Sequence, residues 1–147
     1  MREYKFRGLA ISEQGSSCLE KWVNGNLIKA DNGDSFIVHW QRETAIGYMT
    51  TIWQIKPETV GQYSGVHDSE DAENELYHGD IVEVEIDKKV VRCKVHYEAP
   101  GFMLVSDELD DGYEWISDRM ECDRNFIWIP NSKLIGNIYE HPHLLKE

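Results

Sequence analysis

The segment 80–97 constrains the fold of this chain more than any other part of its sequence. Apolar and charged residues alternate there on two arms that a short turn separates. Alternation with a period of two predicts an antiparallel hairpin with one buried and one exposed face. We therefore expect Val84 and Val91 in a core, and Glu83 and Glu85 outside it. The apolar positions that alternate with polar ones are Val82, Val84, Ile86, Val91, Cys93, Val95 and Tyr97.

Two registers fit this hairpin equally well. Pairing of Ile86 with Val91 places Glu85 opposite Arg92, whereas a slip of two residues places Glu83 opposite Arg92. Both registers bring opposite charges together across the strands, a contact that contributes a few tenths of a kcal/mol up to about 1 kcal/mol. Both also keep the same apolar face, so the sequence leaves the register open.

Strand signals recur along the rest of the chain at intervals of about ten residues, as in barrels and sandwiches. Val, Ile, Thr and aromatic residues number 43 against five Ala, a balance that favours strands over helices. We predict a mainly β chain with little helix, in a small barrel-like antiparallel architecture, SH3-like or related, with a sandwich as the alternative. The segments expected as strands are 2–7, 36–40, 48–55, 102–105, 113–116, 126–129 and 134–140.

Glycine, asparagine and proline punctuate this pattern. Gly8 is expected to end the first strand, and the pairs Asn24-Gly25 and Asn32-Gly33 are turn signals. Pro57 stops the strand before it, because proline cannot donate to a central ladder.

The net charge of −12 is unevenly distributed. The segment 68–123 holds 18 acidic and five basic residues, whereas the rest of the chain holds nine acidic and ten basic. Five carboxylates fall within 68–75, so this segment is expected to be an exposed loop or a frayed helical turn that buries nothing. Clustered Lys and Arg would indicate a nucleic-acid-binding surface. The charge of the acidic half therefore argues against direct nucleic-acid binding by that half.

No sequence motif indicates an enzyme or a metal site. The chain has no Walker loop, GxGxxG, HExxH or GxSxG pattern. Cys18, Cys93 and Cys122 lie far apart without CxxC spacing, which indicates reduced thiols and no zinc knuckle. His141 and His143 flank a proline and are interpreted as a polar tail. We expect no cofactor, no metal and no catalytic residues.

No apolar run reaches the roughly 20 residues that span a bilayer, and no signal peptide opens the chain. We therefore expect no membrane association and a cytoplasmic location.

Three blocks of sequence together resemble the YopX family of bacteriophage and prophage proteins. The first is Arg-Glu-Tyr-Lys-Phe-Arg at 2–7. The second joins Gln-Tyr-Ser-Gly-Val-His-Asp at 62–68 to Glu-Leu-Tyr-His-Gly-Asp-Ile-Val at 75–82. The third is Ile-Gly-Asn-Ile-Tyr-Glu-His-Pro at 135–142, followed by Leu-Leu. The order of the blocks, from end to end of the chain, makes the resemblance specific.

The second block departs from the family pattern in three residues and in its loop. Ser64 replaces a threonine, Val66 a leucine and His78 a glutamate, and the acidic segment 69–74 replaces a shorter turn. The interpretation of the blocks is structural: Gly79 would supply an unusual backbone angle and Asp80 would cap the turn.

The resemblance implies a β-rich, barrel-like fold over 1–147, as a single YopX-like domain or as two subdomains, 1–60 and 61–147. It also implies a phage origin, and hence the cytoplasm of an infected or lysogenic bacterium. It brings no catalytic residues.

Two functional hypotheses follow, and a hydrolase is kept as a third alternative. The first is a non-enzymatic accessory protein that binds a host or phage macromolecule, in particular a basic protein, through an acidic face. The second is a small-molecule or nucleotide binder with an aromatic-lined pocket near Arg2, Tyr63 and His78. A homo-oligomer is left open. The residues chosen for the first hypothesis are Asp110, Asp111, Tyr113, Glu114 and Trp115.

Overall fold

A computed structural model of the chain describes residues 4–11, 21–44 and 47–145. These residues form thirteen strands in two sheets, and three 3₁₀ helices of at most four residues. The prediction of a mainly β chain with little helix is confirmed. The contacts divide the chain into two compact units, unit 1 up to Gln62 and unit 2 from Tyr63.

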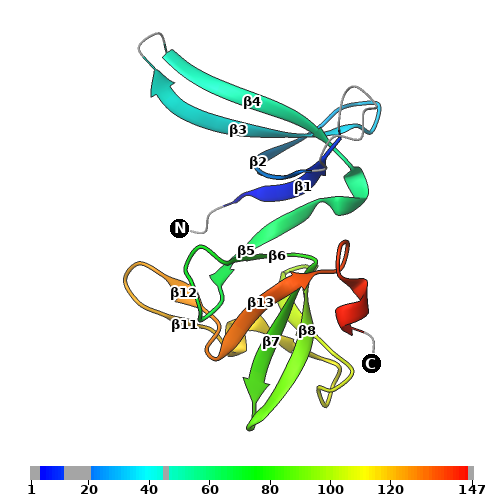
Figure 1. The fold of residues 1–147 in the computed structure, drawn as a ribbon, viewed down its shortest axis with the longest axis vertical. Helices are drawn as coiled ribbons and strands as arrows, with labels where there is room; N and C mark the ends of the chain where they lie inside the picture. Colours follow the sequence, from blue (N-terminus) through cyan, green and yellow to red (C-terminus); the bar gives the residue numbers. More distant parts are fainter. Residues whose placement is uncertain (1–3, 12–20, 45–46, 146–147) are drawn as a thin grey trace. The chain divides into compact units, whose positions relative to one another are not determined.

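Unit 1 is built from the first four strands, which pair in a ring. β1 pairs with β2, β2 with β3 and β3 with β4, and a single bridge between Ala10 and Ile55 joins β1 to β4. Figure 1 shows β3 and β4 as a long hairpin. The core of this unit contains Val23, Ile37 and Ile55. Its elements are β1 (Phe6–Ala10), β2 (Lys21–Lys29), β3 (Ser35–Thr44), β4 (Gly47–Ile55), η1 (Pro57–Thr59) and the start of β5 (Gly61–His67).

Two glycines expected to interrupt strands lie inside them. Gly8 is within β1, and Gly25 is within β2. A Cβ atom on Gly8 would lie 2.6 Å from Ile55 Cδ1, and one on Gly25 would lie 2.3 Å from the Val38 oxygen. These glycines therefore allow close packing, and the predictions of a strand end and a turn there were wrong. The predicted turn at Asn32-Gly33 is confirmed between β2 and β3.

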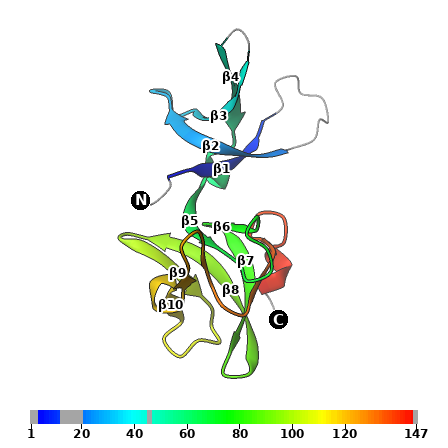
Figure 2. The same ribbon diagram turned by 90° about the vertical axis from the view of Figure 1, so that its left-hand side faces the viewer.

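Unit 2 contains a five-stranded sheet in the order β10-β9-β8-β7-β13. The end of β5 pairs with β6 and β12, and β12 pairs with β11. Figure 2 shows β8, β9 and β10 next to one another. The elements are β6 (Glu75–Tyr77), β7 (Asp80–Ile86), β8 (Lys89–Glu98), β9 (Gly101–Val105), β10 (Tyr113–Trp115), η2 (Ile116–Asp118), β11 (Glu121–Cys122), β12 (Ile127–Trp128), β13 (Ser132–Asn137) and η3 (Pro142–Leu145).

Strands β7 and β8 form the predicted hairpin. Val84 lies opposite Val91 and Glu83 opposite Arg92, which selects the second of the two registers. Asp87 and Lys88 both have positive φ, 52° and 67°, as in the two-residue turns whose twist matches that of the strands. Val84 and Val91 are buried, whereas Glu83 and Glu85 are not, so the predicted facing is confirmed.

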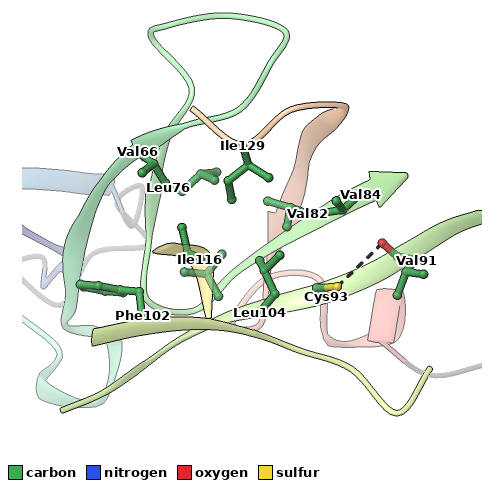
Figure 3. Packing of buried hydrophobic residues seen from close by; sticks show 11 residues of the cluster. Val66, Leu76, Val82, Val84, Val91, Cys93, Phe102, Leu104, Ile116 and Ile129 are labelled. Carbon is green, nitrogen blue, oxygen red and sulfur yellow. Dashed lines mark hydrogen bonds between the residues drawn. The ribbon is translucent and has the colours of Figure 1, made fainter. Parts of the chain in front are cut away.

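The hairpin contributes to the hydrophobic core of unit 2. Figure 3 shows side chains from β7, β8 and β9 meeting Leu76 of β6 and Ile129. Fully buried apolar side chains of this kind each contribute roughly 1.5–3 kcal/mol to the free energy of unfolding. The buried members are Val66, Leu76, Val82, Val84, Val91, Cys93, Val95, Phe102, Leu104, Ile116 and Ile129.

The acidic segment 68–75 differs from its prediction. Asp68 is fully buried, and Ser69 Oγ donates a hydrogen bond of 2.7 Å to the Ser132 carbonyl oxygen of β13. The expectation that this loop buries nothing was therefore wrong. The error arose because composition shows the charge of a carboxylate but not the backbone N–H groups that can surround it. The remaining acidic residues of the loop are exposed or half-buried.

In the three described ranges, no helix is long and apolar enough to cross a membrane.

Candidate functional site

The predicted binding residues Tyr113, Glu114 and Trp115 form strand β10, at one end of the five-stranded sheet. Glu114 lies opposite Leu104 of β9, which is fully buried. Side chains alternate between the two faces of a strand. Glu114 therefore points to the core side, and Tyr113 and Trp115 point to the opposite side.

The side of the sheet that carries Tyr113 and Trp115 is here called the outer face. Tyr113 lies opposite Val105 of β9, which in turn lies opposite Lys94 of β8. Trp115 likewise lies opposite Met103 of β9, which lies opposite His96 of β8. The two aromatic rings contact each other edge to face, with centroids 6.1 Å apart and an interplanar angle of 82°. Tyr113 is 46% exposed and the others are half-buried. The outer face consists of Lys94, His96, Met103, Val105, Tyr113 and Trp115.

The loop 106–112 places carboxylates directly before β10. Backbone hydrogen bonds fold the loop, from Ser106 N to the Gly112 oxygen and from Gly112 N to the Leu109 oxygen. Leu109 packs against the core, which fixes the loop to the sheet. Its four acidic residues, Asp107, Glu108, Asp110 and Asp111, are all exposed.

Most of these carboxylates face solvent, but one is in an ion pair. Glu108 Oε1 lies 3.5 Å from Lys89 Nζ. Both side chains are substantially exposed, so this pair contributes little to stability. Asp110 and Asp111 are exposed, and they precede Tyr113 by three and two residues.

Glu114 has a different environment from its two neighbours. Arg119 donates to it from two nitrogens, with Nη2 3.0 Å from Oε1 and Nε 3.1 Å from Oε2. This bidentate pair is partly buried, and such pairs are more strongly oriented than single ion pairs. Glu114 therefore fixes β10 to the chain that follows it and does not share the outer face.

The thiol of Cys93 lies on the core side of β8. Burial, and secondarily the negative charges of Glu114 and Glu108, raise the pKa of this thiol to about 12. A thiol with such a pKa is an unreactive small hydrophobe at neutral pH. The burial of Cys93 agrees with its place among the apolar positions of the predicted hairpin. Cys122, by contrast, is exposed.

The residues of the alternative ligand site have separate surroundings. Arg2 lies outside the described residues. Tyr63 is buried, with its ring centroid 5.4 Å from that of Tyr77. His78 is half-buried, its Nδ1 accepts a hydrogen bond of 2.9 Å from Tyr97 N, and its ring lies 5.0 Å from that of His96. His78 therefore lies at the margin of the outer face, and the ligand-site hypothesis stays a prediction.

The sequence-based choice of residues missed Met103, Val105, His96 and Lys94. Each of them belongs to an alternating strand, but a contact across two strands depends on register. The only sequence pattern that could have indicated these residues was the period-two alternation of 89–98 and 101–105. That alternation gives the face on which each residue lies, but not which residues lie opposite it on neighbouring strands.

The glycine and asparagine residues of the family blocks build turns. Gly79 has φ +96°, and Asp80 Oδ2 accepts a hydrogen bond of 2.8 Å from Tyr77 N, as predicted. Asn137 Oδ1 accepts hydrogen bonds from the backbone N–H groups of Tyr139 and Glu140. The second and third blocks meet where Ile138 N donates to the Gly79 oxygen at 2.8 Å. The second and third blocks thus have a structural role.

His141 of the third block and His143, directly after that block, lie close to each other. The ring centroids of His141 and His143 lie 6.2 Å apart, and His141 Nδ1 accepts a hydrogen bond from Asn137 N. Across the part of the chain that the structure describes, no group of three or more His, Cys, Asp or Glu residues is placed to hold a metal ion.

Comparison with known proteins gives one family and one similar structure. The family model described as YopX protein matches residues 16–146. The crystal structure of protein EF1440 from Enterococcus faecalis is similar, with a TM-score of 0.53 and 19% sequence identity, over 99% of this chain and 100% of that chain. At this identity the likeness concerns the fold alone. A search of curated proteins found no match.

Proposed function

This chain belongs to the YopX family, and we propose that it is a non-enzymatic accessory protein of a bacteriophage or prophage that binds a protein partner. Its proposed place of action is the cytoplasm of the infected or lysogenic bacterium. The partner is a basic protein of the host or the phage.

One observation carries this proposal: an aromatic pair and a group of carboxylates lie together on unit 2. Tyr113 and Trp115 share the outer face, and Asp110 and Asp111 directly precede them. Binding surfaces commonly combine buried aromatic anchors with a charged rim. The outer face and the loop 106–112 have both components.

The two components would have different roles in binding. Exposed ion pairs contribute about 0–1 kcal/mol each, so the carboxylates alone would not give a stable complex. An aromatic side chain such as Tyr113 loses much more solvent-exposed apolar area when a partner covers it. The rings would therefore supply affinity, whereas the carboxylates would raise the association rate and select for a basic partner.

The charge distribution supports a basic protein rather than a nucleic acid. Residues 63–147 include 20 acidic and eight basic residues, whereas residues 1–62 include seven of each. A field of one sign attracts oppositely charged partners and repels a phosphate backbone.

Capture from lysogenic cells with matched variants tests the aromatic part of this proposal. Tyr113→Ser removes the exposed ring of the outer face. Ile52→Ser removes an exposed apolar side chain from β4 of unit 1, outside the outer face and the loop 106–112. The proteins that wild type captures should be lost with Tyr113→Ser and kept with Ile52→Ser.

Equal capture by wild type and Tyr113→Ser would contradict the proposal and favour the small-molecule alternative. A thermal melt of each variant is the control for folding, since both positions are exposed and both variants should remain folded.

A further inference from the structure

We propose that β10 is an open sheet edge to which the partner adds an extended, basic segment as a sixth strand. This inference rests on the proposed function and deepens it, because it specifies the conformation and the chemistry of the segment that is bound.

The two edge strands of the five-stranded sheet, β13 and β10, differ in whether other residues cover their outward-facing backbone groups. At the β13 edge, Leu134 N donates to Asp68 Oδ2 at 2.8 Å, and Ser132 N donates to Ser69 Oγ at 2.9 Å. The acidic loop thus occupies the backbone groups that another strand would use. Covering an edge in this way prevents unwanted strand pairing.

The β10 edge has no comparable cover among the described residues. β10 pairs with β9 and ends the strand order on that side. Outside the strand ladders, the described backbone hydrogen bonds nearest to β10 involve Gly112 before it and Ile116 after it, and none involves residues 113–115. Alternate residues of a strand direct their N–H and C=O groups to opposite sides, so part of the backbone of residues 113–115 faces away from β9.

Strand β10 is held in place independently of any partner. The ion pair between Glu114 and Arg119 lies on its core side, and the Trp115 ring lies over Gly101 of β9, where a Cβ atom would be 3.6 Å from it. A firmly held edge can template an added strand without first becoming ordered.

The side chains around this edge indicate the chemistry of the occupant. Exposed carboxylates lie at both ends of β10, Asp110 and Asp111 before it and Asp118 after it. An added strand would place every second side chain on the outer face, beside Tyr113 and Trp115. The best fit is a short segment in which Lys or Arg residues alternate with apolar residues.

Synthetic peptides test this inference with the complete chain. The probe is a library of eight-residue peptides with Lys or Arg at alternate positions and varied apolar residues between them. The best binder is then compared with its mirror-image D-peptide and with two versions N-methylated at alternate residues, one in each register. Fluorescence anisotropy gives the affinities, and hydrogen exchange gives the amides that become protected.

Strand addition predicts that the D-peptide and one N-methylated version bind at least tenfold more weakly than the L-peptide. The other N-methylated version should bind within a few-fold, because its altered amides face away from β10. Amides within residues 113–115 should become protected, and Tyr113→Ser should weaken binding whereas Ile52→Ser should not.

Three outcomes would overturn the inference. They are equal binding by all four peptides, protection confined to other strands, and no binding by any library member. Equal binding that weakens with salt and with Tyr113→Ser would leave the proposed acidic and aromatic surface intact. If the proposed function itself is wrong, wild type and Tyr113→Ser will instead capture cell proteins equally.

Discussion

The backbone N–H of Leu134 donates a hydrogen bond of 2.8 Å to the fully buried carboxylate of Asp68. Three more donors, Glu70 N, Asp71 N and Asn74 Nδ2, lie 3.0–3.1 Å from the same two oxygens. Four N–H donors thus satisfy the two buried oxygens of this carboxylate. Asp68 thus ties the acidic loop to β13.

Replacing Asp68 with Asn should lower the free energy of unfolding by about 2–4 kcal/mol, because an amide NH₂ would face N–H donors where a carboxylate oxygen now accepts. Urea denaturation measures this change. Glu73→Gln, which removes an exposed charge of the same loop, should change it by less than about 0.5 kcal/mol. Equal stability of the two variants would contradict the structural role of Asp68.

Gly79→Ala should destabilise the chain more than Gly112→Ala does. Both glycines have positive φ, +96° and +82°, so both substitutions strain the backbone. Only at Gly79 would the new Cβ approach another residue, 2.9 Å from Tyr139 Cε2. The difference in the free energy of unfolding should be about 1–3 kcal/mol. If the two variants unfold at the same denaturant concentration, the contact with Tyr139 has no energetic role.

Val84→Asn should be much less stable than Val90→Asn. Val84 is fully buried, so the new amide would lack hydrogen-bond partners, whereas Val90 is exposed on the neighbouring strand. We expect thermal and urea unfolding to show a difference of about 3 kcal/mol between them. Similar melting temperatures would argue against the core in Figure 3.

A thiol reagent should label Cys122 and not Cys93 in the folded protein at pH 8. The pKa of Cys93 is raised to about 12, so the reactive thiolate is absent, and burial blocks access. The measurement uses a Cys18→Ser background, in which one thiol should react before denaturation and two after it. Two reactive thiols in the native state would contradict the placement of Cys93.

The same pKa shift predicts the direction of a pH effect on stability. The thiol pKa is 9.0 without burial and about 12 in the folded chain, so between these values the unfolded chain binds fewer protons than the folded one. The contribution of Cys93 is therefore complete below pH 9 and falls as the pH rises toward 12. Cys93→Ala should show a shallower loss of stability over this interval, and parallel curves would contradict the assignment.

The sequence was most informative where alternation was long. The two arms of 80–97 predicted the facing of Val84 and Val91, but both registers kept that face. The turn residues Asp87 and Lys88 have the positive φ angles of a two-residue turn. Asp is common at the first position of such turns, but Lys88 stands where glycine is usual, so the sequence did not specify the turn.

Prediction failed where one residue type can serve two purposes. Gly8 and Gly25 signal breaks in sequence, yet they permit close packing within β1 and β2. Asp68 is one of five nearby carboxylates, and only the fold distinguishes it as the buried one. The structure shows a mainly β fold that includes a ring of four strands. The barrel-like architecture stays a prediction.

The candidate site was predicted in part. Residues 113–115 were chosen together because they are adjacent in sequence, but alternation in β10 separates Glu114 from Tyr113 and Trp115. The neighbours Met103 and His96 come from other strands, and no local pattern in the sequence specifies their register against β10.

Binding of a basic partner to the acidic and aromatic surface of unit 2 can be tested by capture of partner proteins at low and high salt. The measurement compares Asp110→Asn/Asp111→Asn with Glu70→Gln/Glu73→Gln. Each pair of substitutions removes two exposed carboxylates, so the net charge changes equally.

The proposal predicts weaker capture by the first variant alone. It also predicts that added salt narrows the difference from wild type, since the Debye length shortens to about 10 Å at 0.1 M. Equal loss of capture by both variants would indicate a response to net charge only. Unchanged capture by the first variant at every salt concentration would contradict the proposed surface.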